Sequence, residues 1–101
     1  MKNEINLKIM DRYFNDVIRG LKTFEIRSND RKYYVNQILN LYEICIDEKE
    51  NECWNYTTRS VRVRITYILS DPLYVKEGYV VLGIKLCFKD KVKIKMKGWK
   101  K

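Results

Sequence analysis

The chain has 101 residues, of which 46% are hydrophobic and 13% aromatic, so it can form one domain around a single modest core. It contains no histidine, which excludes a Ser-His or Cys-His nucleophile within the chain and argues against a conventional zinc site. The formal net charge of +8 is unevenly spread, because residues 1–88 hold 14 Lys and Arg against 12 Asp and Glu, whereas residues 89–101 hold 7 against 1.

The chain has no apolar run long enough to cross a membrane, and its first residues, MKNEINLK, are too polar for a signal peptide. We therefore expect a cytoplasmic protein without a membrane partner. The three cysteines, Cys45, Cys53 and Cys87, have no paired spacing, and we expect them to be small hydrophobic residues in a reducing compartment. No metal or cofactor is expected.

Residues 4–10 alternate between apolar and polar side chains, which predicts a strand. The period then changes, because apolar residues between Met10 and Leu21 recur at i, i+3, i+4 and i+7. This pattern predicts an amphipathic helix over residues 11–19, with Asp11 as its N-cap and Gly20 as its C-terminal stop.

Residues 22–27 return to strand alternation, with Phe24 and Ile26 on one face and Thr23, Glu25 and Arg27 on the other. The following SNDR at 28–31 has the composition of a turn, because Asn and Asp bond to their own backbone and tolerate left-handed dihedrals.

Three more strands are expected downstream. Residues 35–46 read as a strand that is apolar on both faces in its second half, and an acidic, aromatic connection at 47–57 follows it. The next strand places Val61, Val63 and Ile65 inward and Arg62 and Arg64 outward. A loop at 71–78 leads to a last strand at 79–88 that we expect to be buried on both sides.

The predicted order is β-α-β-β-β-β. Short, regularly spaced strands of this kind commonly close into a small barrel. We therefore predict an α+β, mainly β fold, a small twisted barrel with one N-terminal amphipathic helix, over residues 1–88, followed by a basic strand or tail at 89–101.

The segment GLKTFEIRSNDR, followed by YYVNQILNLYE and later by GYVVLGI, resembles the ASCH family of the PUA-like superfamily, in particular its small bacterial and phage subfamily of unassigned function. The resemblance covers about residues 4–88. Its specific element is G-x-K-x-x-E-x-R, here Gly20, Lys22, Glu25 and Arg27, continued by the turn residues Asn29, Asp30 and Arg31.

The chain departs from this pattern at one point. The subfamily usually has Val-Gly-Asp before its third strand, and this chain has Val35, Asn36 and Gln37. Asn tolerates the positive φ that Gly favours, so we expect the turn to be kept, although the carboxylate is absent.

The resemblance implies a twisted barrel with the helix against one opening and a cleft lined by Lys22, Glu25 and Arg27. It implies RNA or a modified nucleoside as the ligand. In this interpretation Arg27 is a planar donor for phosphate or a base edge, Glu25 accepts hydrogen bonds from a base, and Lys22 adds a charge at the cleft mouth. In the alternative interpretation Glu25 and Arg27 form a rim ion pair and the turn only closes a hairpin.

Strand parity places Lys22 on the side of Phe24, so Lys22 reaches Glu25 only if the chain bends after Gly20. Aromatic residues that can stack on a base follow the motif or begin the last strand, with Tyr33, Tyr34 and Tyr79 as first choices. The predicted ligand site is Lys22, Thr23, Glu25, Arg27, Asn29, Asp30, Arg31, Tyr33 and Tyr79.

Two groups of basic residues lie outside this site. Arg62 and Arg64, with Arg59 nearby, form either a phosphate track or a solvated sheet face. Residues 91–97 alternate lysine with apolar residues, which predicts an ordered strand whose Lys91, Lys93, Lys95 and Lys97 either protect a sheet edge or contact phosphate.

Two functions from different classes follow. The first is a module that binds RNA or a nucleotide-like ligand. The alternative is an amidohydrolase for an N-acylated cytidine, which the resemblance allows because relatives of this fold use a Lys, a Thr and a Glu. Lys22 matches that lysine, whereas Glu25 replaces the Thr, so we expect little or no deacylation. A role in protein interaction is the third possibility.

Overall fold

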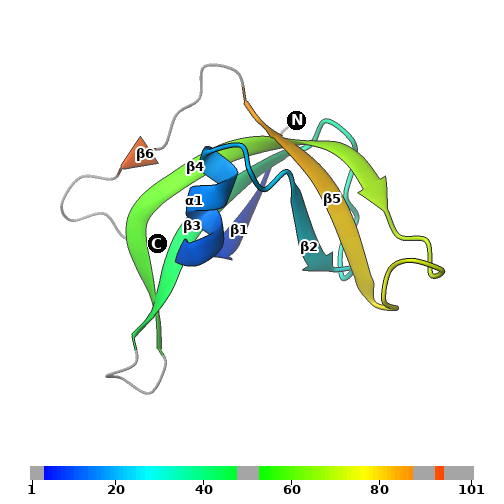
Figure 1. The fold of residues 1–101 in the computed structure, drawn as a ribbon, viewed down its shortest axis with the longest axis horizontal. Helices are drawn as coiled ribbons and strands as arrows, with labels where there is room; N and C mark the ends of the chain where they lie inside the picture. The colour runs from blue at the N-terminus through cyan, green and yellow to red at the C-terminus, as the bar shows by residue number, and fades with distance from the viewer. Residues whose placement is uncertain (1–3, 48–52, 88–92, 95–101) are drawn as a thin grey trace.

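The computed structural model of the protein describes residues 4–47, 53–87 and 93–94. Figure 1 shows a curled sheet beside a short helix. The elements in chain order are β1 (Glu4–Met10), α1 (Asp11–Ile18), β2 (Phe24–Ser28), β3 (Ile38–Asp47), β4 (Cys53–Leu69), β5 (Tyr79–Leu86) and β6 (Lys93–Ile94). The predicted fold class, mainly β with one N-terminal helix, is confirmed.

The sheet has the strand order β1-β3-β4-β5-β2, and β6 pairs with β4 off this path. The β1–β3 pair is parallel, and the β3–β4, β4–β5 and β2–β5 pairs are antiparallel. The sheet curls into a half-barrel in which β1 and β2 are the two edges. The interior of the curl holds the core, which combines inward residues of β1, β3, β4 and β5 with the helix residues Phe14 and Val17.

Helix α1 forms because its apolar residues lie on one side, where Phe14 and Val17 are buried. Its end is as predicted. Gly20 has φ +78, its N–H donates to the Val17 carbonyl at 3.0 Å, and the Leu21 N–H donates to the Asp16 carbonyl at 2.9 Å. This is a Schellman termination, which favours glycine at the left-handed position.

The predicted N-cap is wrong. Asp11 is the first helical residue, and Met10 stands at the cap position without a side-chain cap bond. The Asp11 carboxylate accepts a hydrogen bond from the Arg12 N–H, one residue on. The β1 strand runs directly into the helix, so Asp11 is already helical.

Two of the predicted boundaries also change. The connection expected at 47–57 is shorter, because β4 begins at Cys53 and runs for 17 residues. The last strand is not buried on both sides, since Val80, Leu82 and Ile84 are buried while Tyr79 and Lys85, on the other face, are exposed. Asn36 has φ 76, as the sequence predicted, and its N–H donates to the Ile65 carbonyl.

None of the helical segments within residues 4–47 and 53–87 is long and apolar enough to cross a bilayer.

Candidate functional site

The G-x-K-x-x-E-x-R element forms a compact ion cluster at the start of β2. Glu25 is 4% exposed and faces the interior of the curl, opposite Leu82 of β5. The Lys22 Nζ lies 2.9 Å from the Glu25 Oε2, and an Arg27 guanidinium nitrogen lies 3.3 Å from the Oε1. The three charged residues of the motif are therefore brought together as predicted, with the carboxylate between two cations.

Lys22 reaches Glu25 because it precedes the strand. Regular β2 geometry begins only at Phe24, and the positive φ of Gly20 turns the chain before it. The Lys22 Nζ also donates to the Phe24 carbonyl at 2.6 Å, which fixes the ammonium beside the first residue of the strand. The bend that strand parity required is therefore present.

Arg27 joins the two edges of the sheet. Its guanidinium donates to the Lys8 carbonyl of β1 at 3.1 Å, in addition to contacting Glu25. Because β1 and β2 are the edges of the half-barrel, this side chain bridges the gap that no strand pair fills among the described residues. Both Glu25 oxygens already accept bonds from cations, so a ligand that used this carboxylate would have to displace one of them.

We expect Glu25→Gln to lower the free energy of unfolding by about 1.5–3 kcal/mol, the range for hydrogen bonds to charged groups. The amide nitrogen of glutamine is a donor, and it would have to face one of the two cationic donors, Lys22 or Arg27, in place of an accepting oxygen. Urea unfolding measures this loss. The matched control is Asp30→Asn, since Asp30 pairs with Arg31 at 3.7 Å with 65% and 46% of the two side chains exposed.

An exposed pair contributes little, so the control should change stability by less than about 0.5 kcal/mol. Equal, small effects in both variants would show that the Glu25 cluster does not hold the sheet edge.

A pocket of about 250 Å³ opens beside the motif, between the end of α1 and the end of β5. Its walls are mainly apolar, and Lys22, Thr23 and Lys85 supply the polar side chains. The lining residues are Val17, Gly20, Lys22, Thr23, Val63, Ile84, Lys85 and Leu86. Two predicted site residues, Lys22 and Thr23, thus line the pocket, whereas Glu25 and Arg27 lie outside its lining.

The other predicted ligand residues are dispersed. Asn29 donates its backbone N–H to the Gly78 carbonyl at 2.9 Å, which ties the turn to the loop before β5. Asp30 and Arg31 pair with each other on the surface. Tyr33 packs against the core cluster, and Tyr79 is 40% exposed on the outer face of β5.

The arginines of β4 differ in their partners. Arg62 forms a 2.9 Å ion pair with Glu4, and Arg64 donates to the side-chain oxygen of Asn36 at 2.9 Å. Lys93 belongs to β6, which pairs with β4 opposite Ser60. The predictions for Lys91, Lys95 and Lys97 lie outside the described residues.

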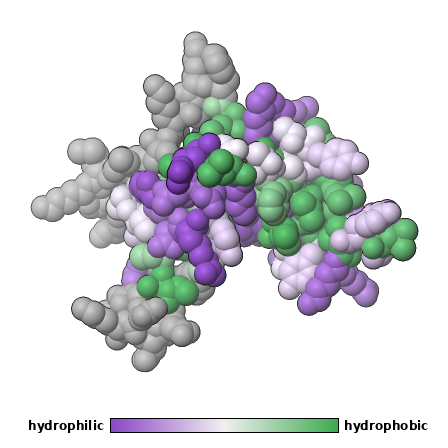
Figure 2. Space-filling view, in the orientation of Figure 1, coloured by the Kyte–Doolittle hydropathy of each residue, from purple (hydrophilic) through white to green (hydrophobic). Residues whose placement is uncertain are grey.

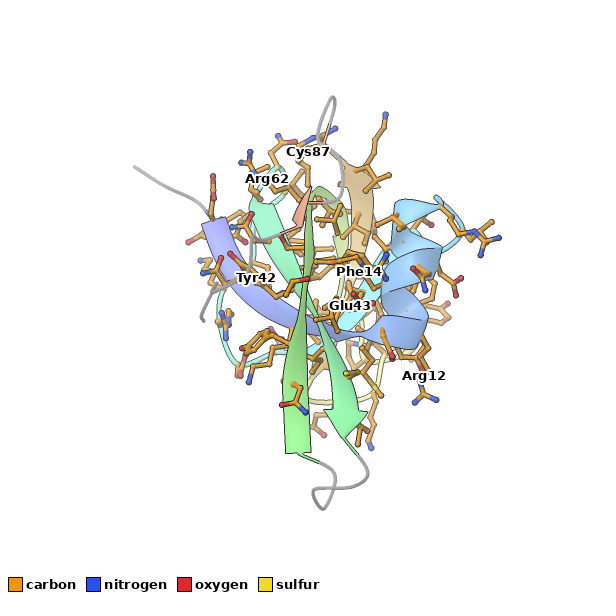
Figure 3. The ribbon with its side chains drawn as sticks, turned by 90° about the vertical axis from the view of Figure 1, so that its left-hand side faces the viewer. Arg12, Phe14, Tyr42, Glu43, Arg62 and Cys87 are labelled. Atoms are coloured by element: carbon orange, nitrogen blue, oxygen red, sulfur yellow. The ribbon has the colours of Figure 1, made fainter. Side chains whose placement is uncertain are left out.

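Arg59 is not part of an outward basic face. Its guanidinium holds the buried Glu43 carboxylate with two bonds of 2.8 Å, donates to the Asn15 side chain at 3.0 Å, and lies 4.7 Å from the centre of the Phe14 ring. The Thr57 hydroxyl donates to the same carboxylate. Figure 3 shows Glu43 and Phe14 between α1 and the two long strands.

A bulge creates this second cluster. Tyr42 pairs with Ser60 and Ile44 pairs with Tyr56, so Glu43 alone stands opposite residues 57–59 of β4. The extra residues include Thr58, at φ 85, and the bulge directs both Thr57 and Arg59 at one carboxylate. Parity offered a signal for this, because Glu43 follows the inward residues Leu39 and Leu41.

The contacts set the ionisation of this pair. Burial alone raises the pKa of Glu43, but the bonds from Arg59 and Thr57 and the charge of Arg59 outweigh burial and hold this pKa below its ordinary value of 4.5. The hydrogen bond with Glu43 in turn raises the pKa of Arg59. The pair is therefore ionised and acts as a structural unit.

Within the described residues, no group of three or more Cys, Asp or Glu side chains is arranged to hold a metal ion. No curated protein matches the chain. A family model with the description Domain of unknown function (DUF3850) matches residues 5–84, which span β1 to β5 and include both ion clusters. The chain therefore belongs to this DUF3850 family.

Proposed function

We propose that the domain binds RNA or a nucleotide-like ligand in the pocket beside Lys22. The observation that carries the proposal is the combination of mainly apolar walls with the two lysines, Lys22 and Lys85. Apolar walls accept the faces of the planar base of a nucleotide, and an ammonium group attracts the phosphate of that nucleotide. The resemblance of the G-x-K-x-x-E-x-R element to the ASCH family supports the same ligand class.

The two lysines have different roles in this proposal. The Lys22 Nζ is held by Glu25 and the Phe24 carbonyl, so it positions the pocket wall. Lys85 is exposed and forms no ion pair with any described residue. Lys85 is therefore the cation that is available to a phosphate.

The contacts of Lys22 give no support to the alternative hydrolase. A lysine that acts as a base or nucleophile directs its amine at the substrate, whereas the Lys22 amine is directed at a carboxylate and a carbonyl of its own segment. Binding is accordingly the function that we propose.

The Lys85→Gln variant should weaken binding of a single-stranded RNA oligonucleotide and flatten the log–log dependence of its affinity on salt by about 0.7, the value for one phosphate contact on a single strand. Fluorescence anisotropy at several salt concentrations measures both quantities. The control is Arg12→Gln, which removes an equal charge from an exposed residue at the other end of α1. The same slope for Lys85→Gln and the wild type would contradict the proposal.

A further inference from the structure

The outer face of the sheet, on the side of β2 and β5, is unusually apolar. Tyr79, Val81, Gly83 and Lys85 alternate with the buried residues of β5 and therefore face outward. Neighbouring strands extend this face in register, since Phe24 of β2 and Tyr67 of β4 both pair with Gly83, and Ile26 pairs with Val81.

Five large side chains form what we call the outer platform: Phe24, Ile26, Tyr67, Tyr74 and Tyr79. Their exposed fractions run from 40% for Tyr79 to 79% for Tyr74. Figure 2 shows the apolar surface over β2, β5 and the loop between β4 and β5. Exposed apolar surface gathered in one place commonly marks an interaction site.

The platform contains a groove of about 270 Å³. Its lining consists of Ile26, Tyr74, Val75, Lys76, Tyr79 and Val81. Lys76 is the charged residue of this lining, and its Nζ lies 5.5 Å from the centre of the Tyr79 ring. The groove therefore presents aromatic rings together with a positive charge.

The other end of the same face is basic. Lys85 pairs in register with Arg64 of β4, so the two side chains emerge side by side. Arg64 bonds to the neutral Asn36 side chain, and neither cation is ion-paired with a carboxylate of the described residues. The platform is thus flanked by Lys76 at one end and by Arg64 and Lys85 at the other.

We infer that the outer platform binds the bases of single-stranded RNA, an inference that rests on the proposed function and extends its site. Tyrosine rings stack on unpaired bases of any sequence, and lysine and arginine hold the backbone between them. A second copy of this chain fits the charge of the face less well, because both copies would present the cations Lys76, Arg64 and Lys85.

Lys85 links the platform to the pocket, because it lines the pocket and also stands on the outer face. From Lys85 to Tyr79 the strand extends over six residues, about 20 Å at ~3.3 Å per residue. A strand of several nucleotides can follow β5 over this distance, with its phosphates at Lys85 and Arg64 and its bases on the tyrosines.

The test is the affinity of a 12-nucleotide oligo(U), a length of about the known site size of single-strand-binding domains, for the full chain. Tyr74→Ala and Tyr79→Ala should each weaken binding about tenfold without changing the salt slope, because base stacking is lost and phosphate contacts remain. Tyr79→Phe should keep the wild-type affinity, since the ring is retained. Binding of a duplex should not respond to any of these variants.

The matched control is Tyr34→Ala. Tyr34 is 47% exposed and has the Lys32 Nζ 5.7 Å from its ring, but, although the sequence made it a stacking candidate, it lines neither the pocket nor the groove. This variant should bind oligo(U) as the wild type does. Thermal unfolding followed by circular dichroism checks that each variant is folded, and Tyr74, the more exposed ring, is the safer position.

If the wild type binds oligo(U) and the Tyr74 and Tyr79 variants bind it equally well, the platform inference fails and the proposed function stands. If the wild type binds neither oligo(U) nor mononucleotides, both fail. A wild-type dimer in sedimentation that the Tyr74→Ala variant dissociates would assign the platform to a second copy and overturn the inference.

Discussion

Replacing Arg59 with methionine is expected to lower the free energy of unfolding by about 3 kcal/mol at pH 7. The Glu43 side chain is 3% exposed, and Arg59 supplies two of its hydrogen bonds and its counter-charge. Without Arg59 the carboxylate keeps the hydrogen bond from the Thr57 hydroxyl but loses its counter-charge. We expect a loss at the lower end of the range for breaking buried ion pairs, because the Arg59 side chain is 32% exposed.

The variant should also reverse the contribution of Glu43 to the pH dependence of stability. In the wild type the folded-state pKa of Glu43 lies below 4.5, so its contribution is present above that pH and is lost as the pH falls towards the lowered pKa. In Arg59→Met, burial without the cation raises this pKa above 4.5. The folded variant then favours the neutral, protonated Glu43 carboxyl, and its stability is lost as the pH rises through the raised pKa. The deficit relative to the wild type should therefore shrink from pH 7 to pH 4.

Two controls separate the buried pair from a general loss of charge. Arg62→Met breaks the partly exposed pair with Glu4 and should cost less than about 1 kcal/mol, with a deficit that changes little with pH. The double variant Glu43→Gln, Arg59→Met removes both charges and should recover part of the lost stability. Chemical unfolding at each pH measures the differences. A deficit in Arg59→Met that stays constant from pH 4 to pH 7 would contradict an ionised Glu43.

The regular parts of this fold follow from periodicity. The helix was predicted at 11–19 and is found at Asp11–Ile18, because its apolar spacing requires one buried side and Gly20 permits the left-handed termination. The inward positions of Val61, Val63 and Ile65 were predicted from alternation and are confirmed. Asn36 adopts the positive φ expected of it.

The irregular parts did not follow, since a bulge changes which residues meet. Arg59 was grouped with the outward arginines, although three residues of β4 stand opposite Glu43 and turn Arg59 towards that carboxylate. The outer platform was missed for another reason. Alternation assigns the residues of β2 to two faces, but it does not determine which face points into the core. In the structure Glu25 faces inward, and Phe24 and Ile26 are exposed. That choice depends on the two cations that neutralise Glu25, which the fold brings together.

The same reasoning limits what the motif residues reveal about the ligand. The family resemblance implied that Lys22, Glu25 and Arg27 would meet, although strand parity alone placed Lys22 on the other face, and the three residues are in contact. Their contacts with one another, and that of Arg27 with the β1 edge, are internal to the fold. The residues that remain available to a ligand, such as Lys85 and Tyr74, belong to no recognisable spacing, because the register of β5 with its neighbours places Lys85 and the loop between β4 and β5 places Tyr74.

Phe14→Ala is expected to have the largest effect of all, a loss of about 4 kcal/mol in the free energy of unfolding. The Phe14 ring is fully buried and, with Val17, supplies the buried face of the eight-residue helix. Leucine at this position should cost about 1–1.5 kcal/mol, because most of the volume is kept. A loss below about 2 kcal/mol for Phe14→Ala would mean that the helix is held mainly by polar contacts.

A double-variant cycle would test whether the helix and the Glu43 cluster form one unit. The Arg59 guanidinium lies 4.7 Å from the centre of the Phe14 ring and donates a hydrogen bond to the side chain of Asn15, the next residue of the helix. Truncating Phe14 therefore also removes one side of the packing that holds Arg59 against Glu43. The two separate losses of unfolding free energy, from Phe14→Ala and from Arg59→Met, should consequently sum to more than the loss in the double variant, by about 0.5–1.5 kcal/mol.

Val17 supplies the control, since it is buried on the same helix and lines the pocket. The loss of stability from Val17→Ala should therefore add to the loss from Arg59→Met without coupling. Equal additivity for both helix positions would show that the helix packs on the sheet independently of the ion cluster.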